Sequence, residues 1–532
     1  MSRFRVGART TTVLAIAGAA VVGVGKAVLL WMLPLRALVM CPWLLDDTFI
    51  FARIARNLAI GRGYSFDGVT PTSGAPPLWI WITSLNHLRL GPEAAARVTL
   101  VESVVLGAAA AVMVFLLARK VLSTRVAWTA LALTVFLAPL LFSCGVGMET
   151  SLFTLLGLLC LFMYVRMGDE GSTLSYFALG CVLGITHLAR LDGAFLTLAI
   201  VVYEAGRVFR LPRGERQRGV VRLLALALGA GLLSVPAAVL AFRAEGSLLP
   251  ANQVGRRWIA WESVRLADGS VPLPLYVRGV VRRFLEFQNL VNIETGSGVV
   301  AALSVLWLAV RRRAGRLPWI AGIYLVSYFG TLVLYQWFFP DAHGFRYLSL
   351  PAHLLSITVA GFLWDATELA GFTRRARVVV VGALVLLLLS TSAYRYRDVS
   401  RGLGSVENAR ILPTFTRAEV DEWWAMIDWI GANIPAGTVV AATDHGKLAY
   451  FTDVRVIDLE GILDPAMIDR FLSGTTGEYL KGRGVSYVLL PANPHRLANR
   501  MVSGALALEE VPDAPREVLR SLWRVVPPSP DD

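Results

Sequence analysis

The chain has 532 residues, of which 55% are hydrophobic and only 17% are charged, and its formal net charge is +13. A soluble globular protein carries roughly 25% charged residues, so this composition excludes an ordinary soluble protein. Much of the positive charge lies in short loops between apolar blocks, without the interleaved aromatic pattern of a nucleic-acid groove, and we expect no nucleic-acid partner.

The N-terminal segment is basic at first and then apolar as far as Met40. This pattern resembles a signal peptide, but further apolar blocks follow, and we interpret the segment as an uncleaved first membrane span. Lys26 inside this span is unusual. It either extends toward the membrane surface or faces a polar cavity, and we favour the cavity because charges inside membranes are usually buried in protein.

Eleven apolar blocks are interpreted as membrane-spanning helices, for which about 20 apolar residues are typical; some of the blocks are shorter. Residues 174–189 and 192–206 are interpreted as two spans that turn near Arg190, because one long helix would place the later Arg-rich loops on the wrong side. The predicted spans are 12–33, 95–118, 126–143, 150–166, 174–189, 192–206, 220–243, 297–310, 317–338, 346–364 and 377–394.

The charged loops orient the chain. With a cytoplasmic N-terminus, all four Arg-rich loops are cytoplasmic, as the positive-inside rule requires. The basic residues of these loops are Arg119, Lys120, Arg125, Arg207, Arg210, Arg213, Arg216, Arg218, Arg311, Arg312, Arg313, Arg316, Arg374, Arg375 and Arg377. The stretches 34–94, 144–149, 244–296, 339–345 and everything after about 395 are then extracytoplasmic, on the outer face of a bacterial plasma (inner) membrane.

The four cysteines have no CxxC or zinc-type spacing. Cys41 and Cys144 both fall in predicted outer loops, and whether they form a disulfide stays open.

The C-terminal part differs in character. "AEVDEWWAMIDWIGANI" has helical spacing, while "TVVAAT", "VRVIDLEG" and "VSYVLLP" are typical of short buried strands. Alternating strands and helices predict a small α/β domain with a parallel sheet. The predicted fold is therefore a polytopic α-helical membrane domain (1–394, including outer loops 34–94 and 244–296) followed by an extracytoplasmic α/β domain (395–532). No glycine-rich phosphate loop is present.

Two adjacent acids, Asp46 and Asp47, follow the first apolar segment on the predicted outer face. A carboxylate there could accept the proton of an attacking hydroxyl group. Alternatively, Asp46 caps a helix that begins at Asp47. Neighbouring helix positions diverge by roughly 100°, so we do not expect both acids to point into one cavity.

Other polar residues from distant parts of the chain fall on the same predicted face. Arginine suits a donor phosphate because its planar fork binds two oxygens at once. The candidates for donor-phosphate or substrate binding are Arg53, Glu149, Arg190, Asp192, Arg256, His343 and Arg346. Each also has a plainer interpretation: Arg53 on lipid head groups, for example, or an Arg190–Asp192 ion pair in a turn. The acids could bind one divalent ion, but no ligand spacing requires it, and no metal ligand is assigned.

The stretch "DDTFIFARIARNLAIGRGYSFDGVTPTSGAPPLW" (Asp46 to Trp79) resembles the first outer loop of the bacterial GT-C glycosyltransferases. The closer likeness is to the protein O-mannosyltransferase, aminoarabinose transferase and mycobacterial arabinofuranosyltransferase group. "GVGMETSLF", "HLARLDGAF", "GSLLPANQVGRR", "FRYLSLP" and "YFTDVRVIDLEGILDP" match further blocks in order, so the likeness covers nearly the whole chain. Ala75 and Pro76 replace a Phe–His pair common in the group, so a contact made by that His is not carried over.

The resemblance implies a GT-C fold and an inverting transfer of a pentose or hexose, such as arabinofuranose or mannose. The donor would be a polyprenyl-phosphate-linked sugar, and the acceptor a cell-envelope glycan, lipid or protein. In that superfamily an acid of the first outer loop serves as the base, which implies Asp46 first and Asp47 second. The alternatives are a transporter or flippase of lipid-linked sugars, or a non-catalytic glycan-binding scaffold. A transporter commonly shows internal repeats, and none is evident between the two halves.

Overall fold

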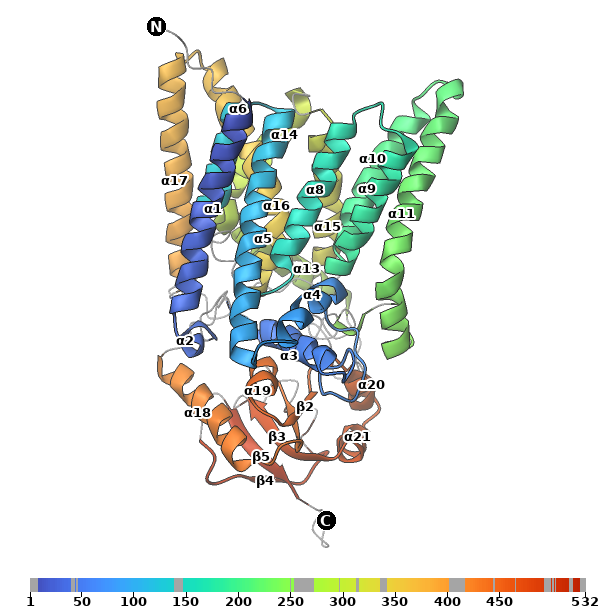
Figure 1. Cartoon of the computed structure of the whole chain (residues 1–532), viewed down its shortest axis with the longest axis vertical. Helices are drawn as coiled ribbons and strands as arrows, with labels where there is room; N and C mark the ends of the chain where they lie inside the picture. Colours follow the sequence, from blue (N-terminus) through green and yellow to red (C-terminus); the bar gives the residue numbers. More distant parts are fainter. Residues whose placement is uncertain are drawn as a thin grey trace. The chain divides into compact units, whose positions relative to one another are not determined.

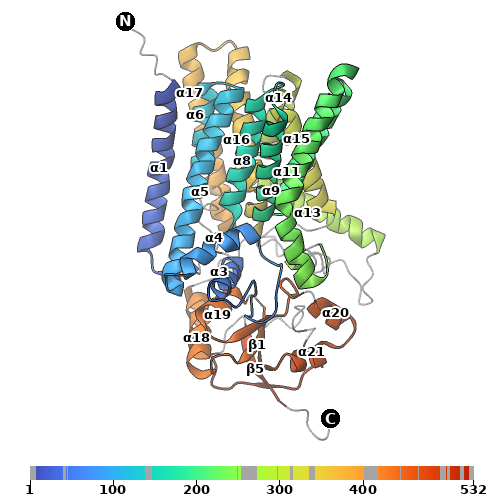
Figure 2. The ribbon, with the colours of Figure 1, turned by 45° about the vertical axis from the view of Figure 1, so that its right-hand side comes forward.

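The structure is a computed structural model, and Figures 1 and 2 show its ribbon in two orientations. It describes residues 8–39, 44, 46–137, 147–248, 250–252, 272–295, 297–311, 315–334, 342–400, 417–443, 445–464, 466–491, 499, 502, 504–515 and 520–526. Cys41, Cys144 and Arg256 lie outside these residues, so the predictions made for them are not addressed by the structure.

The contacts divide the chain into two compact units. The first unit comprises Met1–Leu33, Leu100–Val235 and Tyr276–Pro413, and the second comprises Pro34–Thr99, Pro236–Leu275 and Thr414–Asp532. The sequence analysis grouped the first outer loop with the membrane domain, whereas this division places it in the same unit as the C-terminal residues. The predicted domain border at residue 395 stays a prediction.

Each of the eleven predicted spans overlaps a helix, and Figures 1 and 2 show these helices running side by side. They are α1 (Ala8–Met32), α5 (Pro92–Val121), α6 (Thr124–Phe136), α8 (Thr150–Met167), α9 (Thr173–Ala189), α10 (Gly193–Phe209), α11 (Arg213–Glu245), α14 (Gly298–Arg311), α15 (Leu317–Leu334), α16 (Ala342–Leu369) and α17 (Arg374–Ser400). The predicted break near Arg190 is confirmed, because α9 ends at Ala189 and Arg190 has an extended backbone.

Six helices among the described residues are long and apolar enough to cross a membrane. They lie within α1, α5, α8, α11, α16 and α17, and α6, α9, α14 and α15 contain shorter apolar stretches. The protein is therefore a multi-pass membrane protein with a helical membrane domain. The count of eleven spans and the orientation of the termini stay predictions.

Helix α16 is the most enclosed of the candidate spans, since 89% of its apolar window is buried within the protein. It packs against α6, α8, α14 and α17.

Small residues allow other helices to approach closely, as is common in membrane bundles. A Cβ atom added at Gly184 in α9 would lie 2.7 Å from the Ala230 carbonyl oxygen of α11, so that crossing requires glycine.

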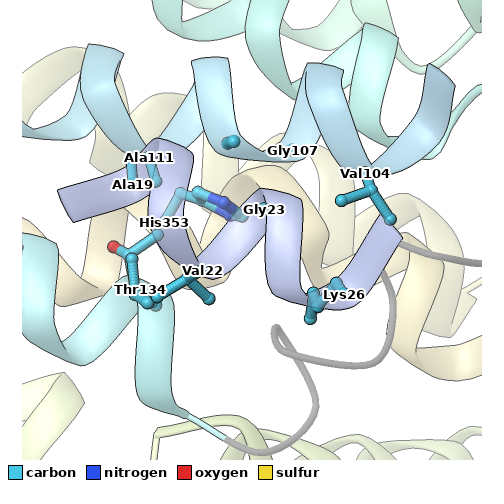
Figure 3. Close-up of a pocket in the computed structure, with 11 residues that line it drawn as sticks. Ala19, Val22, Gly23, Lys26, Val104, Gly107, Ala111, Thr134 and His353 are labelled. Carbon is cyan, nitrogen blue, oxygen red and sulfur yellow. The ribbon is translucent and has the colours of Figure 1, made fainter. Parts of the chain in front are cut away.

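A small cavity of about 30 Å³ lies among helices of the first unit (Figure 3). Lys26 of α1, Thr134 of α6 and His353 of α16 are among the residues that line it. This volume is on the order of a single water molecule. Lys26 therefore lines a cavity large enough for water but too small for a lipid or sugar.

The second unit begins with three helices in the first outer loop, of which the sequence analysis considered only the one that starts at the acid pair. They are α2 (Leu35–Val39), α3 (Asp46–Ala59) and α4 (Pro77–His87), and α13 (Leu273–Thr295) is a fourth helix in predicted loop sequence. Proline occupies the first position of α4. There its fixed φ suits a helix, and its missing N–H group leaves no hydrogen bond unmade. Helix α3 buries most of its residues, including Phe49 and Ile54, and packs against α4 and α19 (Gly446–Phe451).

The C-terminal residues of this unit form a five-stranded sheet of order β2-β1-β3-β5-β4. The strands are β1 (Val439–Ala442), β2 (Arg455–Asp458), β3 (Val485–Pro491), β4 (Leu508–Glu510) and β5 (Arg520–Val525), and the helices are α18 (Arg417–Asn433), α19, α20 (Ala466–Leu472) and α21 (Thr476–Gly482). Strand β1 pairs in parallel with both β2 and β3, which confirms the predicted parallel strands and the α/β character. The antiparallel β4 and β5 were not predicted.

Candidate active site

The two adjacent acids occupy the first turn of α3, and each is half-buried. The carboxylate of Asp46 accepts two backbone N–H groups, from Gly446 to Oδ2 at 2.6 Å and from Lys447 to Oδ1 at 3.0 Å. Asp46 thus accepts hydrogen bonds from the first backbone N–H groups of α19, a helix 400 residues away in the chain. A carboxylate has about four lone-pair positions, so both oxygens keep capacity for a further donor.

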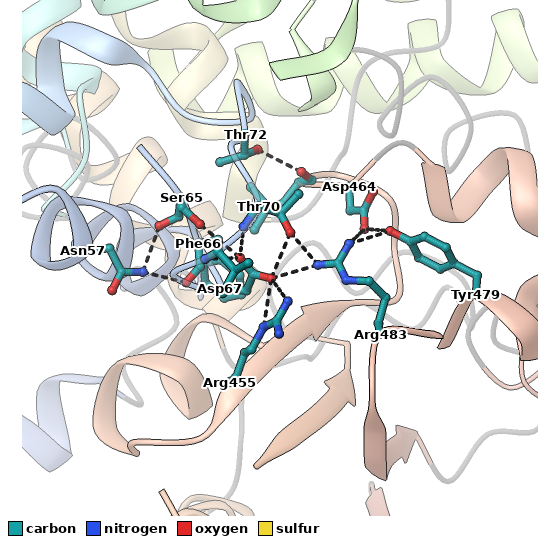
Figure 4. Close-up of polar contacts among 12 residues, drawn as sticks. Asn57, Ser65, Phe66, Asp67, Thr70, Thr72, Arg455, Asp464, Tyr479 and Arg483 are labelled. Atoms are coloured by element: carbon teal, nitrogen blue, oxygen red, sulfur yellow. Dashed lines mark hydrogen bonds and ion pairs between the residues drawn. The ribbon is translucent and has the colours of Figure 1, made fainter. Parts of the chain in front are cut away.

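A second acid of the same loop holds the loop to the C-terminal strands (Figure 4). The Asp67 carboxylate accepts the backbone N–H groups of Val69 and Thr70 and forms ion pairs with Arg455 at 2.9 Å and Arg483 at 2.8 Å. Burial raises the pKa of Asp67, but these hydrogen bonds and Arg455 outweigh it, so the net pKa is lowered. Asp67 therefore stays ionised and fixes the loop.

Arg53 lies on the buried side of α3, with only 4% of its surface exposed. Its Nη2 is 3.5 Å from the carbonyl oxygen of Val454, immediately before β2. Burial, together with the nearby charges of Arg56 and Arg62, lowers the pKa of Arg53 to about 10, which leaves it charged at neutral pH. The predicted contact with lipid head groups does not fit this buried position, and Arg53 instead packs α3 against the C-terminal strands.

Four other predicted residues come together in the first unit. Glu149 precedes α8, while Arg190 and Asp192 flank the turn between α9 and α10. Arg190 donates to Glu149 at 2.8 Å through Nη1 and to Asp192 at 2.9 Å through Nε. The plainer interpretation, an Arg190–Asp192 ion pair in a turn, is confirmed and extended by the buried Glu149. Two carboxylates neutralise Arg190, so Arg190 is poorly suited to take a phosphate as well.

Arg346 in α16 is the fourth member of this group, and it is 5% exposed. Its guanidinium contacts the Met148 sulfur at 3.4 Å and lies 5.5 Å from the centre of the Tyr347 ring. The guanidinium carbon of Arg190 also lies near this ring, 5.2 Å from its centre. Tyr347 thus lies within reach of both cations, in keeping with attraction between cations and aromatic rings.

The structure does not describe the side chains of the two remaining predicted residues, His343 and Arg256. His343 belongs to α16, but its side chain lies outside the described part of the structure, as does all of Arg256. Asp46, Asp47 and Arg53 fall in the second unit, and Glu149, Arg190, Asp192 and Arg346 fall in the first.

The sequence analysis missed Asp67, Arg455 and Arg483, and also a cluster of His445, Asp458 and Glu460 in the C-terminal part. One signal was available for the cluster. His445 closely follows the predicted strand TVVAAT, and Asp458 and Glu460 lie in the second half of the predicted strand VRVIDLEG. The carboxyl ends of neighbouring parallel strands meet at one edge of a sheet. Nothing in the sequence pairs Asp67 with its arginines.

Several solved structures share this architecture. The apo oligosaccharyltransferase of Archaeoglobus fulgidus is 14% identical over 91% of this chain and 70% of its own, with a TM-score of 0.56. ArnT from Cupriavidus metallidurans in the apo state is 15% identical over 95% of this chain and 98% of its own, with a TM-score of 0.54. Both are membrane glycosyltransferases of the GT-C superfamily. This chain has the GT-C fold.

The A. fulgidus oligosaccharyltransferase AglB in complex with an inhibitory peptide and a dolichol-phosphate has a TM-score of 0.52, with 13% identity over 96% of this chain and 74% of its own. Residues 410–526 match a family described as a domain of unknown function, DUF8728. No curated protein matches the sequence. At these identities the likeness establishes the GT-C fold, and the activity has to be argued from the residues.

Proposed function

We propose that the chain is an inverting glycosyltransferase that takes a pentose or hexose from a polyprenyl-phosphate donor. The acceptor would be a cell-envelope glycan, lipid or protein, on the extracytoplasmic face of the plasma membrane. The observation that carries the proposal is the GT-C fold along nearly the whole chain, combined with an acid pair at the start of the first-loop helix. Neighbours of this fold include a protein solved with a dolichol-phosphate, which is a lipid phosphate of the proposed kind.

In this proposal Asp46 is the base. The two backbone N–H groups of Gly446 and Lys447 orient its carboxylate, and each oxygen keeps a lone pair for the acceptor hydroxyl. The hydroxyl oxygen bonds to the anomeric carbon as the bond from that carbon to the phosphate oxygen breaks. The proton passes to Asp46, and the lipid phosphate leaves with the electron pair. A single displacement inverts the anomeric configuration.

Arg346 is the cation that we assign to the departing phosphate. Arg190 carries two carboxylate partners, so its role in the proposal is to hold Glu149 and Asp192 in place. Arg256 and His343 keep the substrate-binding role that their predicted place on the outer face gave them. A buried, preformed cation stabilises developing phosphate charge because it needs no reorganisation during the reaction.

The test is transfer by the purified protein in detergent, with mannosyl- and arabinofuranosyl-polyprenyl phosphates as donors and envelope extracts as acceptors. Asp46→Asn should reduce transfer by at least about a hundredfold, the lower end of a general base's contribution, while donor binding persists. Asp469→Asn, on an exposed residue of α20, is the control and should retain activity. Full activity in Asp46→Asn would reject Asp46 as the base.

The same assay addresses the alternatives. Detergent micelles provide no second compartment, so a flippase or a glycan-binding scaffold would form no product with any donor. Mass spectrometry of envelope glycans from a deletion strain would then identify the missing sugar and acceptor.

A further inference from the structure

We propose that His445, Asp458 and Glu460 bind one divalent transition-metal ion of the zinc or manganese type. Each residue offers one ligand atom, and these atoms all lie within 4.8 Å of one another. The three residues come from two neighbouring segments of the second unit: His445 directly precedes α19, and Asp458 ends β2 with Glu460 two residues later. The proposal does not depend on the proposed transfer reaction.

The position of the cluster follows from the parallel pairing of β1 and β2. Ala442 of β1 is paired with Asp458 of β2, so the two strands end at the same edge of the sheet. The chain leaving β1 reaches His445 after three residues. Side chains at the carboxyl edge of a parallel sheet commonly build ligand sites, because the chain turns there and its loops converge.

The imidazole of His445 gives the strongest reason to expect a ligand. His445 is 1% exposed, and neither Nδ1 nor Nε2 has a hydrogen-bond partner among the described residues. Phe66 packs against the ring with its centre 5.0 Å away, which supplies apolar contact but no acceptor. Buried polar atoms nearly always have a partner, because leaving one unpaired costs about 1–3 kcal/mol. A metal ion would satisfy one ring nitrogen directly.

Asp458 gives the second, independent reason. Its carboxylate is 1% exposed, and no Lys or Arg side chain forms an ion pair with it in the described parts of the chain. The backbone N–H groups of Glu460 and Leu463 each donate to one of its oxygens at 2.7 Å, which fixes its orientation. Buried carboxylates without a cationic partner are characteristic of metal ligands, and such outer hydrogen bonds hold a ligand in place.

The distances and ligand types indicate the class of ion. His445 Nδ1 and Asp458 Oδ1 are 3.7 Å apart. Ligands at about 2.0–2.2 Å from a tetrahedral zinc ion are separated by roughly 3.3–3.6 Å, so a small closure brings these atoms to a common ion. One imidazole with two carboxylates suits zinc, manganese or iron, whereas calcium and magnesium prefer oxygen ligands alone.

An ion here would lie next in the chain to the two N–H groups that bind the Asp46 carboxylate. Gly446 and Lys447, whose N–H groups bind Asp46, directly follow His445. Fixing His445 would therefore fix the first turn of α19. The expected role is structural, and the ion would contribute to stability whether or not the chain transfers sugars.

The experiment uses the full-length protein in detergent, stripped with a chelator and then dialysed against Zn²⁺ or Mn²⁺ alone. Elemental mass spectrometry should find about one ion per chain, and calorimetric titration should show one site. Ca²⁺ and Mg²⁺ should bind at least about tenfold more weakly, as the imidazole ligand implies. A protein that retains no Zn²⁺ or Mn²⁺ beyond the level of the buffer would overturn the proposal without reference to any variant.

Three substitutions locate the ion. His445→Phe keeps a ring against Phe66 but removes the ligand atoms, and Asp458→Asn and Glu460→Gln each remove a charge. Each should lower metal affinity by at least about tenfold. Glu478→Gln, on an exposed acid of α21 in the same unit, should bind as the wild type does. If Glu460→Gln and His445→Phe fold and still bind with unchanged affinity, the ion lies elsewhere and the assignment fails.

Discussion

The Nη2 atom of Arg455 in β2 lies 2.9 Å from Oδ2 of Asp67, a residue 388 positions earlier in the first loop. The Asp67 side chain is only 6% exposed, and Arg483 reaches the same oxygen from a third segment. One carboxylate thus joins the first loop to two places in the C-terminal part. This linkage is one of the contacts within the second unit.

Asp67→Asn should destabilise this unit. Breaking a buried ion pair by removing one partner costs about 3 kcal/mol at the low end of the usual range, and the low end applies because both arginines are partly exposed. Thermal unfolding and limited proteolysis of the loop would measure the loss. Asp428→Asn is the matched control, since its pair with Arg36 is more than half exposed and should contribute no more than about 1 kcal/mol. Equal effects in the two variants would contradict the role given to Asp67.

Gly446→Ala should separate α3 from α19. A Cβ atom at Gly446 would lie 2.8 Å from the Ile50 nitrogen and 2.9 Å from Asp46 Oδ2, and backbone atoms cannot easily move aside. Overpacking of this kind costs about 1–3 kcal/mol. It should also reduce sugar transfer, because the N–H group that orients Asp46 moves. Gly431→Ala in α18, where the nearest atom is 4.0 Å away, should leave both stability and activity intact or slightly improved.

The stability of the second unit should depend on pH through His87. Burial, with a smaller effect from Arg56, lowers the pKa of His87 from 6.5 to about 4. The folded state therefore prefers the neutral ring, and the unfolded state takes up a proton first as the pH falls. The contribution of His87 is fully present above pH 6.5 and is lost between pH 6.5 and 4.

His87→Phe tests this pH dependence. The substitution keeps an aromatic contact with Tyr450, whose ring centre is 5.9 Å from that of His87, but cannot take up a proton. The melting temperature of the variant should fall less than that of the wild type between pH 7 and pH 5. Parallel curves for the two proteins across this range would show that His87 does not titrate as described.

Arg346→Lys should weaken the donor interaction if the proposed function is right. Lysine keeps the charge but loses the planar fork, so one charge-assisted hydrogen bond to phosphate is lost, which corresponds to roughly tenfold in affinity or rate. The effect should appear for the lipid-phosphate donor and not for the acceptor. Arg374→Lys, at an exposed position at the start of α17, should leave the kinetics unchanged. A change confined to acceptor kinetics would place Arg346 at the other substrate.

The sequence by itself determined the elements whose signal is local. Apolar blocks gave the membrane helices, and the charge pattern of the loops required the break at Arg190 that separates α9 from α10. Short apolar runs gave β1, β2 and β3, because buried parallel strands are apolar on both faces. Strands β4 and β5 were missed because they are short antiparallel strands that carry several charged residues, and so lack that signal.

Only the tertiary structure decided the partners of the charged residues. Asp46 could be assigned to a helix start, but its donors are backbone N–H groups 400 residues away, and an N–H group has no sequence signature. Likewise, Glu149 and Asp192 neutralise Arg190 because two turns of the chain meet there. Periodicity reports which face of an element is buried, whereas the pairing of charges depends on which elements pack together. That choice is made by the whole fold.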